Sequence, residues 1–255
     1  MLKFQIVILS ATTRTTLIAG RFLEAIWGIG MRRRSIIIYG LISVLAVLLA
    51  CGFILRHKAA LAGEIWLAST EISGLPLDDG DLIFQTSRSS QSAAIQHATG
   101  SMWSHMGMIV FHDGQPYVLE ASATVRYTPL ARWVAYGVGR HFVVKRLADA
   151  RRVLTPEALA KLDSVGASFL GRSYDLTFEW SDDRMYCSEL VWKIYDRALG
   201  VDIGKLQKIR EFNLTDPTVA KLMKQRYGDA VPMDEPVISP VAMFESPLLV
   251  QVAAH

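Results

Sequence analysis

The chain has 255 residues with a formal net charge of +3, and 51% of its residues are hydrophobic against 20% charged. Acidic and basic side chains are interspersed, which excludes the concentrated basic stripe that is typical of a nucleic-acid-binding protein. The hydrophobic excess lies near the N-terminus, and roughly 185 residues follow it, enough for one globular domain with a single core.

In chain order, the first predicted element is an apolar segment at residues 35–55, which has no charged side chain. It is long enough to span a bilayer as a helix. Three arginines at 32–34 precede it directly, so its N-terminal side is expected to stay cytoplasmic and the rest of the chain to be exported. Arg56 and Lys58 on the far side weaken this charge asymmetry slightly. The sequence therefore predicts a membrane tether at 35–55 after an N-terminal extension at 1–34.

A second interpretation of this region begins at Met31 rather than at Met1. From Met31 the chain reads as a signal peptide: three arginines, an apolar stretch and then Leu-Leu-Ala-Cys-Gly at 48–52, which resembles the lipobox of a bacterial lipoprotein. In that case Cys51 is lipidated and becomes the mature N-terminus, and residues 1–30 come from an upstream start or form a dispensable extension. Both interpretations predict a domain at the bacterial cell envelope, anchored on the extracytoplasmic side of the membrane.

Beyond a short helical linker at 56–76, the predicted domain at 77–255 alternates short strands with helices. Strands are predicted at 81–85, 105–111, 117–121, 125–127, 141–147 and 248–252. Helices are predicted at 89–98, 129–136, 156–170 and 213–227, and from Cys187 onward. The Pro-rich segment at 232–247 is predicted to be a loop. Short antiparallel strands with interspersed helices indicate an α+β fold.

Cys187 is the most informative residue of this domain, because it opens a helix whose buried face continues through Leu190, Val191 and Ile194. A thiol in the first turn of a helix lies near unpaired backbone N–H groups and the positive end of the dipole, which favour the thiolate. The chain has 2 cysteines. If Cys51 is lipidated or in the bilayer, the exported domain has one thiol and no internal disulfide. The alternative to a nucleophile is a buried structural cysteine.

A cysteine nucleophile needs a base within hydrogen-bond reach and a group that orients the base. Among the 6 histidines, His105 differs from the others because it begins a strand that is otherwise apolar. Glu120 follows Tyr-Val-Leu in the next strand, an apolar setting in which a carboxylate usually needs a partner. The alternatives are a structural histidine and a solvated charge on the strand.

A hairpin between these two strands places the two side chains on one face. The dipeptide Asp-Gly at 113–114 predicts a two-residue turn. In that register Gly107 lies opposite Glu120 and leaves room for the carboxylate, and His105 lies opposite Ser122. His105 and Glu120 are then diagonal neighbours, about 7–8 Å apart between backbone positions. One extra loop residue would put them on opposite faces of the sheet.

Several short motifs together resemble one known family, the permuted papain-like cysteine hydrolases of the NlpC superfamily, and within it the YaeF/YiiX group. These motifs are GDLIFQ at 80–85, SRSSQS at 87–92, SHMGM at 104–108, YTPL at 127–130, GRSYD at 171–175, WSDDR at 180–184, YCSELV at 186–191 and SP at 239–240. The usual superfamily form has an aspartate between the tyrosine and the cysteine and a glycine after the serine, and both are absent here.

The resemblance implies a circularly permuted fold in which the histidine and its polar partner precede the cysteine. It implies that Cys187 is the nucleophile, that His105 acts as general base and then acid, and that Glu120 orients His105. The backbone N–H of Cys187 would contribute to an oxyanion hole, with Tyr186 as a weaker candidate for lining it. The sequence has no HExxH motif and no Cys/His cluster, so no metal and no cofactor are expected.

Three functional hypotheses follow. The first is a membrane-tethered thiol hydrolase that cleaves amide bonds in cell-envelope peptides or γ-glutamyl linkages. The second is lipid acyl chemistry, as a thioesterase, phospholipase or acyltransferase, and the third is an inactive binding module. Apolar residues around the cleft would favour lipid, whereas charges that recognise peptide termini would favour an amide. Arg126, Arg132 and Arg140 are candidates for carboxylate recognition, each with an ordinary surface charge as its alternative.

Overall fold

The structure, a computed structural model, describes residues 33–255. The predicted extension at 1–34 and the choice between Met1 and Met31 as the start therefore fall almost entirely outside the described residues. Contacts along the chain separate it into two units that divide between Ala60 and Leu61, and each unit is described by itself.

The first described element is one long helix, α2 (Arg33–Ile72), which contains the predicted tether at 35–55 and most of the predicted linker at 56–76. It is continuous because no proline lies within it, and it ends just before Gly74, which has a φ of +77°. Within the described residues its part Ile42–Ile72 is long and apolar enough to cross a membrane. Cys51 is exposed on this helix.

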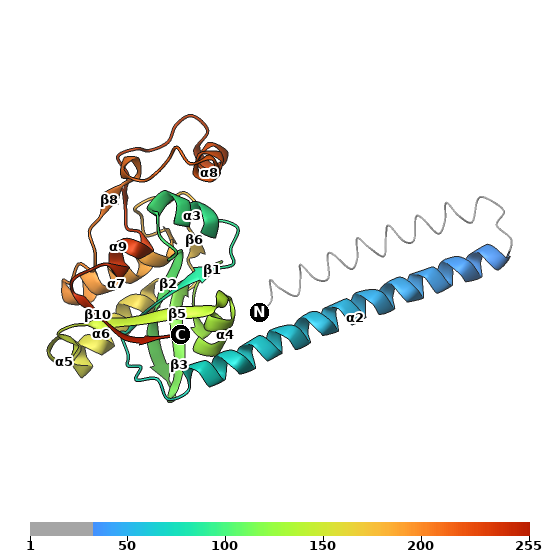
Figure 1. The fold of residues 1–255 in the computed structure, drawn as a ribbon, viewed down its shortest axis with the longest axis horizontal. Helices are drawn as coiled ribbons and strands as arrows, with labels where there is room; N and C mark the ends of the chain where they lie inside the picture. The colour runs from blue at the N-terminus through green and yellow to red at the C-terminus, as the bar shows by residue number, and fades with distance from the viewer. Residues whose placement is uncertain (1–32) are drawn as a thin grey trace. The chain divides into compact units, whose positions relative to one another are not determined.

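The second unit is built on one antiparallel sheet of six strands, in the order β10-β5-β1-β2-β3-β4 (Figure 1). The strands are β1 (Leu82–Ser87), β2 (His105–His112), β3 (Gln115–Ala121), β4 (Val125–Pro129), β5 (Gly137–Leu147) and β10 (Leu249–Ala254). All six predicted strands are present in this sheet, and β5 begins four residues earlier than the alternating pattern indicated. The α+β prediction is confirmed.

Helices pack on both faces of the sheet. The helices of this unit are α3 (Ser92–Thr99), α4 (Leu130–Ala135), α5 (Ala150–Val153), α6 (Pro156–Ser168), α7 (Cys187–Leu199), α8 (Pro217–Tyr227) and α9 (Pro240–Phe244), with a 3-10 turn at Ile209–Glu211. Helix α4 lies on one face and α7 on the other, while α8 packs against α3 (Figure 1). Helix α6 begins where the sequence predicts, because the Thr155 hydroxyl accepts the Ala158 N–H at 3.3 Å and Pro156 follows at the first helical position.

Two short sheets complete the unit. Strand β6 (Ser173–Tyr174) pairs in parallel with β7 (Arg184–Met185), and β8 (Gln207–Lys208) pairs antiparallel with β9 (Pro236–Val237). The prediction that 232–247 is only a loop is wrong, since the segment contains β9 and α9. Ser239 caps α9 by accepting the Ala242 N–H at 3.2 Å, and proline again occupies the first helical position.

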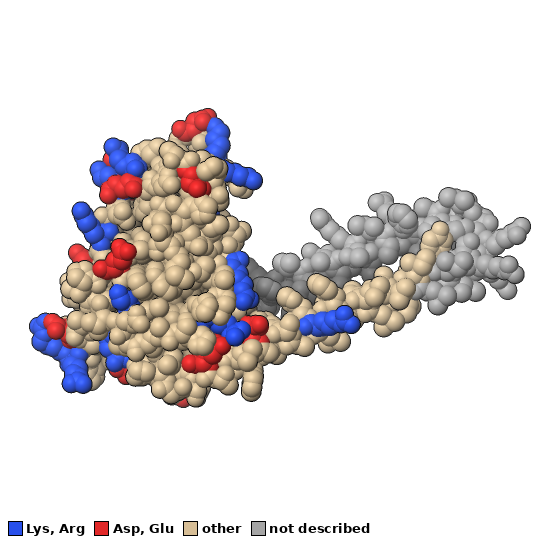
Figure 2. All heavy atoms as spheres, viewed as in Figure 1, with Lys and Arg blue, Asp and Glu red and all other residues tan. Residues whose placement is uncertain are grey.

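Side chains that alternate along each strand divide the core into two layers. On one face Phe84, Met106 and Leu119 pack against α6 and α7. On the other face Ile83 and Ile109, with their neighbours, pack against α4. The surface charges of this unit are mixed: on the face shown in Figure 2, Lys and Arg side chains are interspersed with Asp and Glu. The packing of α7 on the sheet brings its N-terminus, Cys187, to the start of β2, where His105 lies.

Candidate active site

The β2–β3 hairpin has the register that the Asp-Gly turn predicts, with His112 opposite Gln115 and Met108 opposite Leu119. Both turn residues have positive φ, 50° for Asp113 and 72° for Gly114, as a tight two-residue hairpin requires. This register places His105 and Glu120 on the same face of the sheet, and the His105 Nε2 lies 2.6 Å from the Glu120 Oε2.

Gly107 has a different role from the one predicted. A Cβ at this position would collide with the Val118 side chain and lie 2.8 Å from the Leu119 carbonyl oxygen, whereas the Glu120 Cβ would be 3.5 Å away. The glycine therefore allows close approach of β3 as a whole rather than making room for the carboxylate alone.

Glu120 is 3% exposed and makes contacts with both of its oxygens. While Oε2 faces His105, Oε1 accepts the Thr128 hydroxyl at 2.6 Å and lies 3.4 Å from the Arg126 guanidinium. Burial raises the pKa of Glu120, but the hydrogen bond to His105 and the nearby charges outweigh it, so the pKa lies below its usual value. The group is an anion held in one orientation.

Cys187 is buried at the first position of α7, and the His105 imidazole is close enough for a hydrogen bond to influence the thiol. Burial raises the pKa of the thiol, but this hydrogen bond, the positive imidazole and the N–H groups of Met106 and Ser188 lower it below its usual value. For His105, burial lowers the pKa, while hydrogen bonds to Cys187 and Glu120 raise it to about 10. Both shifts favour the thiolate–imidazolium form of the pair. The His105 ring also stacks on Trp133 of α4, with centroids 5.7 Å apart.

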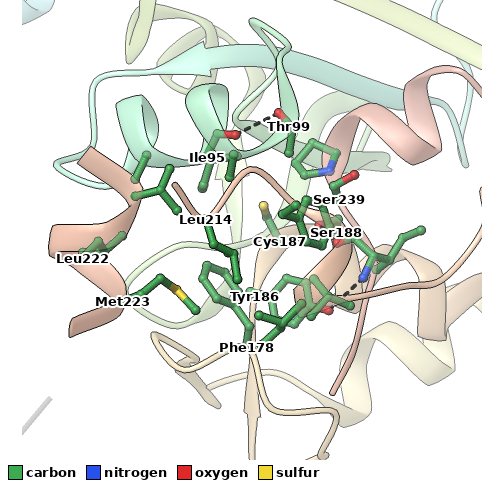
Figure 3. Close-up of a pocket in the computed structure, with 18 of the residues that line it drawn as sticks. Ile95, Thr99, Phe178, Tyr186, Cys187, Ser188, Leu214, Leu222, Met223 and Ser239 are labelled. Carbon is green, nitrogen blue, oxygen red and sulfur yellow. Dashed lines mark hydrogen bonds between the residues drawn. The ribbon is translucent and has the colours of Figure 1, made fainter. Parts of the chain in front are cut away.

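Two cavities flank this pair. The first, shown in Figure 3, has Cys187 in its wall and is otherwise lined mainly by apolar side chains from α3, α8 and the chain around 209–214. The second is a polar cleft with His105 and Glu120 in its wall, together with Arg126 and Arg132. Arg140, the third arginine considered for carboxylate recognition, instead pairs with Glu64 at 2.8 Å and Glu71 at 2.9 Å.

A comparison with known protein families identifies the family of this chain. The family described as "Permuted papain-like amidase enzyme, YaeF/YiiX, C92 family" matches residues 76–253. The chain belongs to this family. The predicted resemblance is confirmed, and with it the permuted papain-like fold and membership of the cysteine amidase and peptidase class of enzymes.

Two YiiX proteins are similar to the chain over most of its length. The protein YiiX of Escherichia coli strain K12, described as uncharacterized, is 49% identical over 174 residues, which cover 68% of this chain and 85% of that protein. A crystal structure described as the metalloprotein YiiX of Escherichia coli O157:H7 has 48% identity and a TM-score of 0.67, covering 70% of this chain and 97% of that one.

The description as a metalloprotein applies to that relative. Among residues 33–255 of the present family member, no group of three or more His, Cys, Asp or Glu side chains comes together in a way that fits a metal ion. Cys187, His105 and Glu120 instead form a series of neighbours, in which His105 Nε2 lies 2.6 Å from Glu120 Oε2 and the same imidazole interacts with the Cys187 thiol. These residues do not match a metal-binding set, and no step of the chemistry below uses a metal.

Tyr174 is a residue of the amidase site that sequence reasoning missed. Its side chain is half-buried and lines the same cavity as Cys187, and burial together with the negative charge of the nearby sulfur raises its pKa well above the usual value. Tyr174 lies in the GRSYD motif, but only the parallel pairing of Tyr174 with Met185 brings it beside the sulfur. Tyr186 lies on the opposite side of the apolar pocket, with its hydroxyl oxygen accepting the Ile238 N–H at 3.1 Å.

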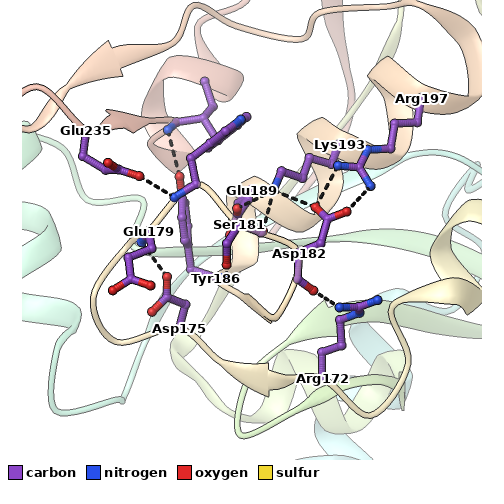
Figure 4. A network of polar contacts seen from close by, with 12 residues as sticks. Arg172, Asp175, Glu179, Ser181, Asp182, Tyr186, Glu189, Lys193, Arg197 and Glu235 are labelled. Atoms are coloured by element: carbon purple, nitrogen blue, oxygen red, sulfur yellow. Dashed lines mark hydrogen bonds and ion pairs between the residues drawn. The ribbon is translucent and has the colours of Figure 1, made fainter.

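A buried polar network, shown in Figure 4, holds the turn that precedes Cys187. The Glu189 carboxylate accepts the Tyr186 N–H at 3.3 Å and pairs with the Lys193 ammonium at 2.8 Å. Lys193 also reaches Asp182 at 3.1 Å, and Asp182 binds Arg197 at 2.7 Å. Burial raises the pKa of Glu189 to about 7, against the opposing effect of Lys193. The first turn of α7 is thus tied to the 175–186 loop.

Proposed function

We propose that the chain is a membrane-tethered cysteine hydrolase that cleaves amide bonds through an acyl-enzyme on Cys187. The observation that carries this proposal is the His105–Glu120 hydrogen bond beside the buried Cys187 thiol, with a cavity on each side of the three residues. A thiolate at a helix N-terminus beside an imidazolium has the arrangement that nucleophilic catalysis by cysteine requires.

The reaction begins when the Cys187 thiolate attacks the amide carbonyl carbon, so that a C–S bond forms and the carbonyl oxygen becomes an oxyanion. The backbone N–H of Cys187 is positioned to donate to that oxygen, since it is unpaired at the helix start. The His105 imidazolium then gives its proton to the amide nitrogen, the C–N bond breaks and the amine leaves.

Hydrolysis of the thioester completes the cycle. Neutral His105 removes a proton from water, the resulting hydroxide adds to the thioester carbon, and the C–S bond breaks to release the carboxylic acid and the thiolate. Glu120 holds the ring in one tautomer throughout, with the Nε2 proton directed to the carboxylate and the other nitrogen to the sulfur. Thr128 and Arg126 hold Glu120 in turn.

The apolar helix and its flanking charges support a location of the proposed hydrolase at the cell envelope. Residues 42–72 have the length and apolarity of a membrane span, and three arginines at 32–34 precede the apolar segment. This charge distribution supports a domain at 77–255 on the extracytoplasmic side, near envelope peptides and γ-glutamyl amides. Mass spectrometry of the chain purified from membranes tests the lipoprotein alternative. A lipoprotein would give an N-terminal peptide that begins at Cys51 and carries the additional mass of the lipid.

One observation favours a second candidate, lipid-directed acyl chemistry with the same three residues. The cavity beside the sulfur is apolar, with Ile95, Leu214 and Met223 among its lining residues. An acyl chain from a thioester or phospholipid would bury apolar surface there. The grouping of a thiol, an imidazole and a carboxylate argues against the third hypothesis, an inactive binding module.

The test is covalent labelling of the full chain in detergent by a thiol-directed acyl probe. Wild type and a Cys51→Ala control are expected to label equally, whereas Cys187→Ala is expected to fold with an unchanged circular dichroism spectrum and to remain unlabelled. Equal labelling of Cys187→Ala, or no turnover of any simple activated ester by wild type, would contradict the assignment of Cys187 as nucleophile.

A further inference from the structure

The polar cleft beside His105 carries an excess of positive charge that the proposed chemistry does not use. We infer that this cleft binds an anionic group, a carboxylate or a phosphate, on the part of the substrate that leaves as the amine. The inference rests on the proposed function, because it uses the direction of the reaction at Cys187 and His105. It concerns the leaving group alone.

Positive charge from four separate elements converges on this cleft. Its wall contains four arginines and a single acidic side chain, that of Glu120. The arginines are Arg88 directly after β1, Arg126 on β4, Arg132 on α4 and Arg226 on α8. They are far from one another in sequence, so a run of charges along one exposed helix face does not account for the cluster. A concave site lined by charges of one sign concentrates their field and attracts ions of the opposite sign.

Two of these arginines are held by neutral partners. Arg132 contacts the Tyr136 hydroxyl at 2.9 Å, and Arg226 contacts the Gln91 side-chain oxygen at 2.8 Å. These contacts orient the guanidinium groups without cancelling their charge. By contrast, six arginines elsewhere in this unit each pair with at least one carboxylate: Arg140, Arg146, Arg152, Arg184, Arg197 and Arg210.

Arg126 lies near a carboxylate, but that carboxylate is already engaged. The guanidinium is 3.4 Å from Glu120 Oε1, while the same oxygen accepts the Thr128 hydroxyl at 2.6 Å and Oε2 faces His105 at 2.6 Å. The Arg126 side chain is still 42% exposed. Arg88 and Arg132 are exposed as well, so a ligand entering from solvent reaches all three guanidinium groups.

The direction of the reaction gives this cleft to the leaving group. His105 donates its proton to the departing nitrogen, so the amine lies on the side of the scissile bond that His105 faces. His105 and Glu120 line the cleft, whereas Cys187 does not. The cleft encloses about 1570 Å³ of space unfilled by protein atoms, part of it open to solvent. It therefore has room for the amine together with the group that bears the anion.

Two of the arginines are close to the base. Arg132 directly precedes Trp133, whose ring stacks on His105 with centroids 5.7 Å apart. Arg126 contacts Glu120, the hydrogen-bond partner of His105. Guanidinium groups bind carboxylates and phosphates through paired N–H donors. An anion bound by either arginine therefore belongs to the departing amine, near the point at which it receives its proton.

The experiment uses acetate esters, so that the acyl group is small and constant and only the phenol that leaves in place of the amine is varied. The purified full chain in uncharged detergent is given 4-acetoxybenzoate, the neutral 4-acetoxybenzamide and 4-acetoxyphenyl phosphate, and each kcat/KM is divided by the rate constant of hydrolysis without enzyme. We expect the carboxylate or the phosphate to exceed the neutral ester by about tenfold, since one charged hydrogen bond is worth that much. The larger of the two values identifies the anion, and equal values for all three esters would overturn the inference.

A fourth ester moves the anion to the other side of the bond. The mono-(4-carbamoylphenyl) ester of adipic acid has its carboxylate on the acyl group and releases the same neutral phenol as 4-acetoxybenzamide. We expect this ester to have no advantage over 4-acetoxybenzamide. An advantage as large as that of the anionic leaving groups would overturn the assignment of the anion to the leaving side.

Variants at the cleft locate the effect. Arg132→Gln is expected to bring the ratio of anionic to neutral ester close to one, and Arg132→Lys, which keeps the charge, is expected to recover part of the ratio. Arg151→Gln removes an exposed arginine that does not line the cleft and is expected to keep the wild-type ratio. A wild-type ratio in the double variant Arg88→Gln/Arg132→Gln would overturn the inference.

The neutral ester separates this inference from the function on which it rests. If 4-acetoxybenzamide acetylates Cys187 but the anionic esters have no advantage, the anion site is wrong and the proposed function stands. If wild type and Cys187→Ala hydrolyse 4-acetoxybenzamide equally, the proposed function itself fails.

Discussion

The sheet side and the helix side of the active site are held in place by different means. On the sheet side, His105, Glu120 and Thr128 come from three consecutive strands, and hairpin register with short hydrogen bonds positions them. On the helix side, the position of Cys187 depends on the buried ion pair between Glu189 and Lys193. It also depends on the hydrogen bond from Ser188 to Ile238, a residue 50 positions further along the chain. The proposed base, His105, is therefore positioned by local geometry, whereas the proposed nucleophile, Cys187, is positioned by long-range polar contacts.

The largest effect is expected from breaking the helix-side network with Lys193→Met. Lys193 is 3% exposed and pairs with Glu189, so its loss leaves a buried carboxylate without its cation. We expect the free energy of unfolding to fall by about 3–5 kcal/mol, measured by urea unfolding of the full chain in detergent at pH 8.

The pH dependence of Lys193→Met has a definite sign. The pKa of Glu189 is about 7 in the folded protein and 4.5 in its unperturbed state, so this group destabilises the fold as pH rises through that interval. Without Lys193 the destabilisation grows and continues to higher pH. Adding Glu189→Gln to the variant removes the charge and is expected to restore part of the stability above pH 7. A double variant no more stable than Lys193→Met would contradict this account.

On the sheet side, Glu120→Gln is expected to lower kcat/KM by about 10²–10³-fold, because the base loses its orientation and its electrostatic support. The negative charge of Glu120 contributes to a His105 pKa of about 10, so its removal shifts the alkaline limb of the pH profile to lower pH. The measurement is kcat/KM for an activated ester between about pH 5 and pH 11, which covers the acid and the alkaline limbs of the pH profile. A full-rate variant with an unshifted limb would argue against the orienting role.

Gly107→Ala tests the close approach of β2 and β3. The added Cβ would meet the Val118 side chain and the Leu119 carbonyl oxygen, so the strands must separate. We expect a loss of about 1–3 kcal/mol in thermal or urea unfolding, with a lower rate because His105 and Glu120 move apart. Gly114→Ala in the turn, where a Cβ has open space, controls for the loss of glycine itself, although it strains a positive φ.

The smallest effect is expected from Thr128→Val, which keeps the shape of the side chain but removes the 2.6 Å hydrogen bond to Glu120. We expect kcat to fall about threefold to tenfold with little change in KM, since one hydrogen bond that positions another group is lost. Thr128→Ser keeps the hydroxyl and is expected to recover most of the rate. Equal rates in wild type and Thr128→Val would show that Glu120 needs no support from β4.

The same contrast explains what the sequence predicted. The Asp113-Gly114 turn and the alternating apolar strands are local signals, and they were sufficient for the register that joins His105 to Glu120. The cap at Thr155 and the helix start at Cys187 are also local, and both are where the sequence indicated.

What sequence reasoning missed depends on contacts between distant segments. Strands β6 and β9 have two residues each, too short for any periodicity, and their pairing is fixed only when the fold is complete. Tyr174 reaches the sulfur through such a pair, so its motif alone gave no position. The lining of the apolar cavity at Cys187 likewise comes from α3 and α8, which are far apart in the chain, so no single stretch of sequence predicts it.

The contacts of Ile238 have a consequence for biosynthesis. Its carbonyl oxygen accepts the Ser188 hydroxyl and its N–H donates to Tyr186, so the residues on either side of Cys187 are held by a segment 50 residues further along the chain. A ribosome-bound chain that has emerged as far as α7 already contains the thiol and the imidazole, yet lacks this brace. The site is therefore expected to be complete only after the segment around Ile238 has been synthesised and has folded against α7.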